Sequence, residues 1–139
     1  MKKQLLCSFL LVILFAWAAA ATEFVIVVNK DNSLTEISKT NLKRLFTGKK
    51  KEIGGVKVVP VNQSLDSDVA KAVLEKILKM DPEEYKEFWV AEQVKGGVSA
   101  PMIQKTNEAV IAIVSQLPGG IGYVEKEKVT DAVKVIPIK

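Results

Sequence analysis

Apolar and polar positions along the chain predict a sheet that is covered by helices. Phe24–Val28 is a continuous run of apolar, mostly β-branched residues, which is typical of a strand buried on both faces. A second apolar run, residues 56–61, is expected to form another strand and ends at a polar loop, residues 62–68. Beyond this loop the apolar residues follow one helical stripe, formed by Val69, Ala70, Val73, Leu74, Ile77 and Leu78.

The order of strand, polar loop and helix favours two interpretations of residues 62–68. Ser64, Asp66 and Ser67 are all good N-cap residues, so any one of them can close the first helical turn. The first backbone N–H groups of a helix lack partners within it, and together with the helix dipole they can bind an anion. The loop therefore either only caps the helix or also forms an anion site.

Three further helices are predicted from cap residues that precede apolar stripes. Their expected starts are Ser38, Asp81 with Pro82 behind it, and Thr106 or Asn107. Gly48 is expected to end the first of them in a left-handed conformation. Residues 96–101 predict a loop, and residues 121–124 and 133–138 predict strands, the last at a sheet edge or strand end because it contains Pro137.

Tyr85, Phe88 and Trp89 form an aromatic face on the helix that starts at Asp81. Such a face can serve as a ligand platform, but large aromatic side chains dominate burial in small domains, so we expect it to belong to the core. The carboxylates at the start of this helix are expected to complement the helix dipole rather than to form an acid/base pair.

The N-terminal stretch has the pattern of a secretory signal peptide. Lys2 and Lys3 precede an apolar segment at residues 5–17, which small residues at 18–21 follow. The apolar segment is shorter than the roughly 20 residues of a membrane-spanning helix. We therefore expect a signal peptide at residues 1–21, one domain at residues 22–139, a periplasmic or secreted location, and no stable membrane insertion after cleavage.

Composition excludes several kinds of chemistry in the expected mature chain. The sequence has no histidine, and its single cysteine, Cys7, lies in the leader, which excludes His- or Cys-based catalysis and zinc sites with nitrogen or sulfur ligands. Without Lys2 and Lys3, 18 of the 20 basic residues remain against 16 acidic ones, an excess too small to indicate a nucleic-acid partner. We expect no enzyme activity and no cofactor, although carboxylate-based hydrolysis stays chemically open.

Several segments, in order along the chain, resemble the phosphate-type ABC transporter substrate-binding proteins. Residues 26–29 with Leu42, Phe46, Gly48 and Lys49 are similar to that family's I-V-V-N … L … I-F-x-G-K opening. Residues 118–124, P-G-G-I-G-Y-V, closely resemble its P-G-A-I-G-Y-V strand entry, and Trp89 precedes a glycine-rich loop as in its W … G … P segment. The resemblance implies a single layered α/β lobe with a mixed sheet flanked by helices, of the type II periplasmic-binding-protein kind.

The resemblance also implies a ligand loop at residues 63–69. In the family this strand-to-helix turn is Arg-Ser-Asp-Gly-Ser-Gly-Thr, and the two serines agree with this chain. The implied anion-binding residues are Gln63, Ser64, Ser67, Asp68 and Val69. Gln63 lacks the charged fork with which arginine grips phosphate, and Asp68 adds negative charge beside the anion. The expected ligand is therefore phosphate or another small anion, bound weakly.

Two functional hypotheses follow from the sequence. The first is an exported solute-binding-type module that works with an ABC permease, in which a second copy of this single lobe could supply the opposing wall of the site. The second is a non-transport accessory or interaction protein of the cell envelope, in which the ligand site has decayed.

Overall fold

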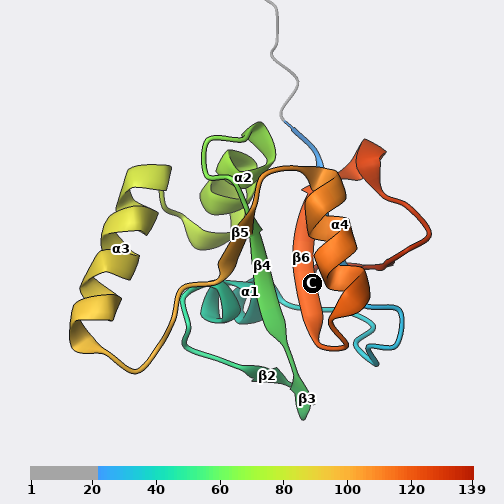
Figure 1. The fold of residues 1–139 in the computed structure, drawn as a ribbon, viewed down its shortest axis with the longest axis horizontal. Helices are drawn as coiled ribbons and strands as arrows, with labels where there is room; N and C mark the ends of the chain where they lie inside the picture. Colours follow the sequence, from blue (N-terminus) through green and yellow to red (C-terminus); the bar gives the residue numbers. More distant parts are fainter. Residues whose placement is uncertain (1–21) are drawn as a thin grey trace, which may run out of the picture.

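The computed structural model describes residues 22–139 (Figure 1). The predicted signal peptide, residues 1–21, lies outside the described residues. Within residues 22–139 no helix combines the length and the apolar character that crossing a membrane requires.

The centre of the fold is a mixed five-stranded sheet with strand order β5-β4-β6-β1-β7 (Figure 1). Strand β4 runs parallel to both β5 and β6, whereas β1 runs antiparallel to β6 and β7. The register pairs Val61 with Met102 on one side and with Gly122 on the other. The strands are β1 (Phe24–Val28), β4 (Val59–Gln63), β5 (Met102–Gln104), β6 (Gly120–Glu125) and β7 (Lys134–Ile136).

Each α-helix begins at a side chain that caps its first turn. The caps are Ser38, Ser67, Asp81 and Thr106, and each accepts a hydrogen bond from the backbone N–H three residues later. The cap therefore satisfies one of the unpaired N–H groups of the first turn. The helices are α1 (Lys39–Phe46), α2 (Asp68–Val73), α3 (Pro82–Lys95) and α4 (Asn107–Gln116), with a π-helix η1 (Leu74–Leu78) after α2 and a 3₁₀ turn η2 (Lys126–Lys128).

The sheet separates two apolar clusters, as the run of β-branched residues in β1 predicted. Ile26 and Val28 face the cluster that contains the buried residues of α1 and α2. Val27 faces the opposite cluster, which contains Val110, Ile111 and Val114 of α4. Helices therefore cover both faces of the sheet, and the predicted layered α/β fold with a mixed sheet is confirmed.

Strand β6 lies unusually close to α4 because two glycines remove side chains from the contact. A Cβ atom on Gly122 would lie 2.9 Å from Cγ1 of Val110, and one on Gly120 would lie 3.0 Å from Cα of Val114. This close packing gives a physical reason for the glycines in residues 118–124.

The central strand differs from its prediction at both ends. Residues 56–61 were expected to form one strand, but Val56–Lys57 is β3, which pairs with β2 (Glu52–Ile53) in a separate hairpin. The next strand, β4, continues to Gln63, so the prediction of a polar loop from residue 62 was wrong. Asn62 and Gln63 stay in the strand because buried polar partners satisfy their side chains.

Three other elements depart from the local pattern. Leu74–Leu78 forms a π-helix instead of continuing α2 as an α-helix, and Lys79 ends it in a left-handed conformation, with a φ of 58°. The short strand β5 follows the predicted loop at 96–101 without having been predicted. The last strand, β7, is shorter than expected, but it lies at the sheet edge as Pro137 indicated.

Helix α3 stands at the side of the molecule (Figure 1) and packs against the core through two buried aromatic residues. Tyr85 and Trp89 are buried, with T-shaped packing between their rings, and Phe88 is partly buried beside them. The Tyr85 hydroxyl donates a 2.7 Å hydrogen bond to the carbonyl oxygen of Phe46 at the end of α1. The prediction that this aromatic face belongs to the core is confirmed.

Candidate ligand-binding edge of the sheet

The carboxyl ends of three parallel strands meet at one edge of the sheet. Strands β4, β5 and β6 end at Gln63, Gln104 and Glu125, and the register pairs Gln63 directly with Gln104. The chain leaves this edge through the loop 64–67, through Lys105 and Thr106, and through η2. These three exits bring segments that are distant in the sequence to one edge.

The helices that follow β4 and β5 diverge to opposite faces of the sheet. Helix α2 follows β4 and packs in the same cluster as α1, whereas α4 follows β5 and packs in the other cluster. Because β4 and β5 are neighbours, the edge between them is a topological switch point. In open α/β sheets ligands bind at such points, outside the carboxyl ends of the strands.

The predicted ligand loop forms the β4 side of this edge. Ser67 is the N-cap of α2, and its hydroxyl accepts from the N–H of Ala70 at 3.2 Å and donates to the carbonyl oxygen of Ser64 at 2.6 Å. Of the three cap candidates, Ser67 is therefore the one that caps the helix. Its hydroxyl already has two partners within the loop, which hold the loop in a tight turn.

The other predicted site residues lie at different depths. Ser64 is half-buried, and its backbone N–H donates to the carbonyl oxygen of Gln104 at 2.8 Å, which joins the loop to β5. Asp68 is exposed at the first position of α2. The side chain of Val69 lies in the core, so only its backbone faces the loop. Ser64 and Asp68 are therefore the side chains with access to a ligand here.

The Gln63 side chain points into the protein interior and not outward, where a ligand at the edge would lie. It is only 3% exposed, and its Nε2 atom donates a 3.0 Å hydrogen bond to Oδ1 of Asn107, the first residue of α4. Asn107 in turn donates to Oε2 of Glu125 at 2.6 Å and accepts from the Glu125 backbone N–H at 3.0 Å. This chain of contacts ties the ends of β4 and β6 to the start of α4.

A second buried polar network lies beneath the same strand end. Asn62 donates to the Tyr85 hydroxyl at 2.9 Å and accepts from the Tyr123 hydroxyl at 2.8 Å. The Tyr123 hydroxyl also accepts from the backbone N–H of Gln63 at 3.2 Å. Burial raises the pKa of both tyrosines, so they stay neutral and act as hydrogen-bonding groups. The network holds the end of β4 in one position.

The sequence did not reveal that the start of α4 shares this edge. Thr106 and Asn107 were recognised only as helix-start residues, and Thr106 does cap α4 through a 3.1 Å bond from the N–H of Ala109. The glycines and the proline of residues 96–101 predicted a loop before α4, but they gave no sign that β5 pairs with β4. Without this pairing, Asn107 and Glu125 could not be placed beside Gln63.

The edge offers donors to an anion but also carries negative charge. The starts of α2 and α4 both point their first N–H groups toward it, which favours an anion. Asp66 and Asp68 are exposed on the β4 side, and Glu108 is exposed in the first turn of α4. Among residues 22–139, no cluster of three or more potential metal ligands of the His, Cys, Asp or Glu type occurs.

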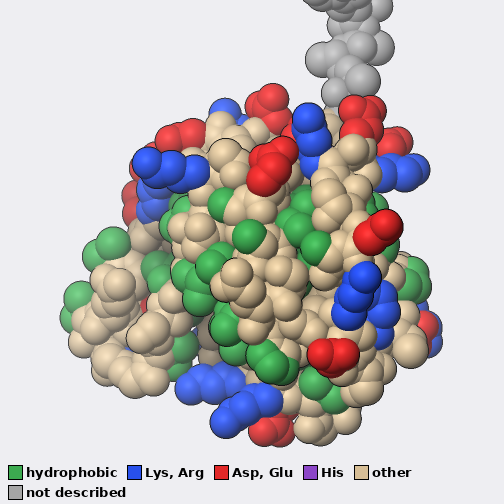
Figure 2. Space-filling view, turned by 45° about the vertical axis from the view of Figure 1, so that its right-hand side comes forward, with side chains coloured by type: hydrophobic (Ala, Val, Ile, Leu, Met, Phe, Trp, Pro, Cys, Tyr) green, Lys and Arg blue, Asp and Glu red, His purple; other side chains and the backbone are tan. Residues whose placement is uncertain are grey.

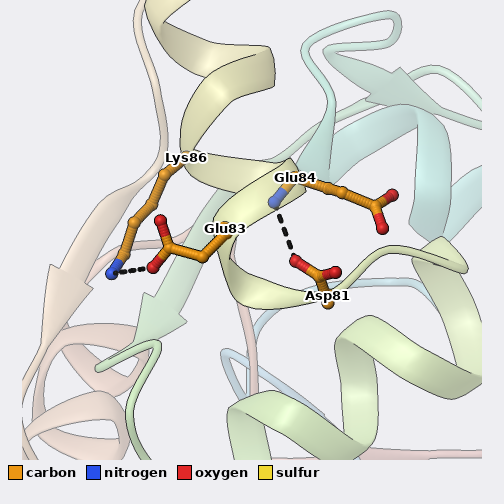
Figure 3. Close-up of polar contacts among 4 residues, drawn as sticks. All are labelled: Asp81, Glu83, Glu84 and Lys86. Carbon is orange, nitrogen blue, oxygen red and sulfur yellow. Dashed lines mark hydrogen bonds and ion pairs between the residues drawn. The ribbon is translucent and has the colours of Figure 1, made fainter.

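The carboxylates at the start of α3 make contacts within their own helix (Figure 3). Asp81 accepts a 2.9 Å hydrogen bond from the N–H of Glu84, and this bond lowers the pKa of Asp81. Hydrogen bonding to the Asp81 carboxyl raises the pKa of Glu84, and Glu83 pairs with Lys86 at 3.3 Å. The pattern matches the predicted helix-start role.

Several solved structures share this fold. An ABC-type phosphate transport receptor from Vibrio cholerae superposes with a TM-score of 0.65 at 21% identity, covering 84% of this chain and 46% of the receptor. A putative phosphate ABC transporter substrate-binding protein from Clostridium perfringens, solved with bound phosphate, gives 0.65 at 16% identity, covering 84% and 45%. PstS from Borrelia burgdorferi gives 0.61 at 18% identity, covering 85% and 47%.

These similarities confirm the fold that the sequence resemblance implied. No protein-family model and no curated protein sequence matches the chain. The chain spans about half the length of the solved structures that it matches.

Proposed function

We propose that this chain is an exported, non-enzymatic solute-binding module that holds phosphate or another small anion weakly at the carboxyl edge of β4 and β5. The binding groups would be the Ser64 hydroxyl and the first backbone N–H groups of α2, at Asp68 and Val69. Ser67 would position these groups as the helix cap, and Gln63 would fix the strand end beneath them.

The observation that carries this proposal is the switch point between β4 and β5. Two helices begin there on opposite faces of the sheet, so two sets of unpaired N–H groups lie on either side of one edge. Backbone N–H groups at helix starts bind phosphate and carboxylate groups without a cationic side chain. A protein that shares this fold has been solved with bound phosphate, which supports phosphate as the kind of ligand.

Three features argue that the binding is weak. Gln63 has no charge and its amide is bonded to Asn107, so it cannot act as the arginine of the resembling loop would. Asp66 and Asp68 repel an anion at the start of α2. The chain also spans about half of the similar proteins, so a complete enclosure of the ligand would need a second wall. A second copy of the chain or an ABC permease could supply it.

Titration of phosphate followed by backbone amide NMR tests the proposal. The expected result is weak binding, with shifts concentrated at residues 64–69 and at Thr106 and Asn107. A Ser64→Ala variant should weaken binding, whereas Ser99→Ala, in the exposed loop 96–101, should leave it unchanged. Shifts spread evenly over the lysines would contradict the assignment, and tight binding by the unmodified monomer would contradict the argument from charge.

A second candidate function is an accessory or interaction role in the envelope. It is favoured by exposed apolar residues on α3 and the edge strand β5, where Val90 is 62%, Val94 85% and Ile103 53% exposed. Val90 and Ile103 border the same pocket, and exposed apolar patches are characteristic of protein contacts. Genes for a permease and an ATPase beside this one would favour transport, whereas a neighbouring envelope sensor or assembly operon would favour the accessory role.

A further inference from the structure

A cavity of about 440 Å³ lies beside α3, at the opposite end of β4 from the candidate anion site. It is lined by Val58, Val59 and Pro60, at the start of the strand, whereas Gln63 and Ser64 lie where the strand ends. The loop 98–101 and Trp89 of α3 form the opposite wall. A volume of this size falls in the range of about 300–1,000 Å³ that is typical of small-molecule sites.

The wall of this cavity is largely apolar and tightly supported. Trp89 is only 6% exposed, and a Cβ atom on Gly48 would lie 2.9 Å from its ring and 2.6 Å from Val98. Val98 and Trp89 therefore both pack closely over Gly48. Val59 and Met102 remain 40% and 41% exposed at the opening, so apolar surface is available to a ligand. Figure 2 shows a hollow between α3 and the rest of the molecule at the lower left.

Three lysines form one rim of the same cavity: Lys50, Lys51 and Lys57. Among residues 22–139, the ion pairs within 4.0 Å involve Lys86, Lys95, Lys126 and Lys139, so none of the three rim lysines has a carboxylate within that distance, although Glu52 lies opposite Lys57 in the β2–β3 hairpin. Lys50 is oriented by a 3.2 Å hydrogen bond from its Nζ atom to Oδ1 of Asn41. Figure 2 shows blue side chains at the lower end of the hollow.

We propose that this cavity binds an amphiphilic anion, with its apolar tail against Trp89 and Val98 and its carboxylate or phosphate head at the lysine rim. A neutral apolar ligand would make no ionic contact with the three lysines, and a small polar anion would leave the apolar wall in contact with water. A ligand that carries both properties would contact both parts of the cavity favourably. This site is separate from the proposed phosphate site and does not depend on it.

Calorimetry with monomeric decanoate tests the proposal, with decan-1-ol and acetate as matched probes and the indole N–H signal of Trp89 as a local reporter. Decanoate should bind and shift the Trp89 signal. Decan-1-ol should bind about tenfold more weakly because it lacks the charge, a difference of about 1.4 kcal/mol. Acetate should leave the Trp89 signal unmoved. Equal affinity for decanoate and decan-1-ol would overturn the role of the lysines.

Two matched pairs of variants locate the site. The double variant Lys51→Glu with Lys57→Glu should weaken decanoate binding about tenfold or more. Its control, Lys30→Glu with Lys128→Glu, makes the same change in net charge at exposed lysines elsewhere and should leave decanoate binding unchanged. Val59→Ser should weaken it, whereas Val135→Ser, a strand valine of similar exposure (45%) on β7, should not.

Two results would overturn the proposal, one from the variants and one from a membrane control. Equal losses in both members of either pair would overturn the proposal, because they would show a general charge or stability effect. Binding to vesicles of anionic phospholipid without any binding of monomeric decanoate would also overturn it, since the lysines would then act as a membrane-surface patch.

Discussion

Nε2 of Gln63 and Oδ1 of Asn107 lie 3.0 Å apart and join two residues that are separated by 44 positions in the sequence. Gln63 ends β4 and Asn107 begins α4, so this hydrogen bond couples the two sides of the candidate ligand edge. Both residues are buried, so water could not easily replace either amide as a hydrogen-bond partner if the other were removed.

Asn107→Ala should therefore lower the free energy of unfolding by about 1–3 kcal/mol, because it leaves the Gln63 amide buried without an acceptor and also removes the two hydrogen bonds between Asn107 and Glu125. Urea unfolding followed by circular dichroism measures the change. The control is Gln116→Ala, at an exposed position of the same helix, which should change stability by less than about 0.5 kcal/mol. Equal effects of the two variants would show that the Gln63–Asn107 bond is energetically unimportant.

Asp68→Gly should strengthen phosphate binding, since it removes a negative charge and a side chain from the start of α2. Adding Gln63→Arg supplies a charged fork, and together the changes should gain about 1–3 kcal/mol of binding free energy. Gln63→Arg also breaks the bond to Asn107, so stability should fall while affinity rises. Calorimetry measures the affinity for phosphate, and thermal unfolding measures the stability. The assignment of this loop would be refuted if the variants raised neither the affinity nor the stabilisation by phosphate.

Trp89→Ala should destabilise the protein by about 3–5 kcal/mol, the range for truncating a large buried aromatic side chain. The matched variant is Val94→Ala on the same helix, where the side chain is 85% exposed and little change is expected. Denaturant unfolding measures both. If Trp89→Ala left stability unchanged, the aromatic face would be a binding surface rather than core.

Stability should depend on the charge of Asp81 in acid. The N–H of Glu84 lowers the pKa of Asp81 below its value of 3.8, so the folded state favours the ionised form. This contribution is fully present above the unfolded pKa and is lost as the pH falls through the lower folded pKa. Asp81→Asn keeps a capping acceptor without the charge, so its stability difference from the native protein should shrink in acid. A difference that stayed constant down to the lowest pH would contradict this role of the charge.

Export with removal of residues 1–21 should give a mature protein that starts near Ala21 or Thr22. Mass spectrometry of the protein recovered from the cell envelope or the medium measures the N-terminus. An intact Met1 in a membrane fraction would contradict the predicted cleavage and favour a retained anchor.

The sequence alone determined the features that depend on neighbouring residues. Ser38, Asp81 and Thr106 cap the predicted helices, and Gly48 has the expected left-handed conformation, because cap and turn chemistry act within a few residues. The unbroken apolar run of β1 likewise predicted burial on both faces, since only a covered strand can lack polar positions. Several segments in order along the chain, of which residues 118–124 are the most specific, carried the resemblance that implied the fold.

Only the tertiary structure decided which of these elements meet. Local patterns could not show that β5 pairs with β4, that α2 and α4 lie on opposite faces, or that Gln63 turns inward to Asn107. The cavity beside Trp89 likewise combines α3 with lysines more than 30 positions earlier in the chain. Strand pairing and burial of polar side chains are settled by contacts between distant segments, where packing and hydrogen-bond satisfaction outweigh local preference. For this reason the sequence indicated a ligand loop, but the edge on which it lies emerged from the fold.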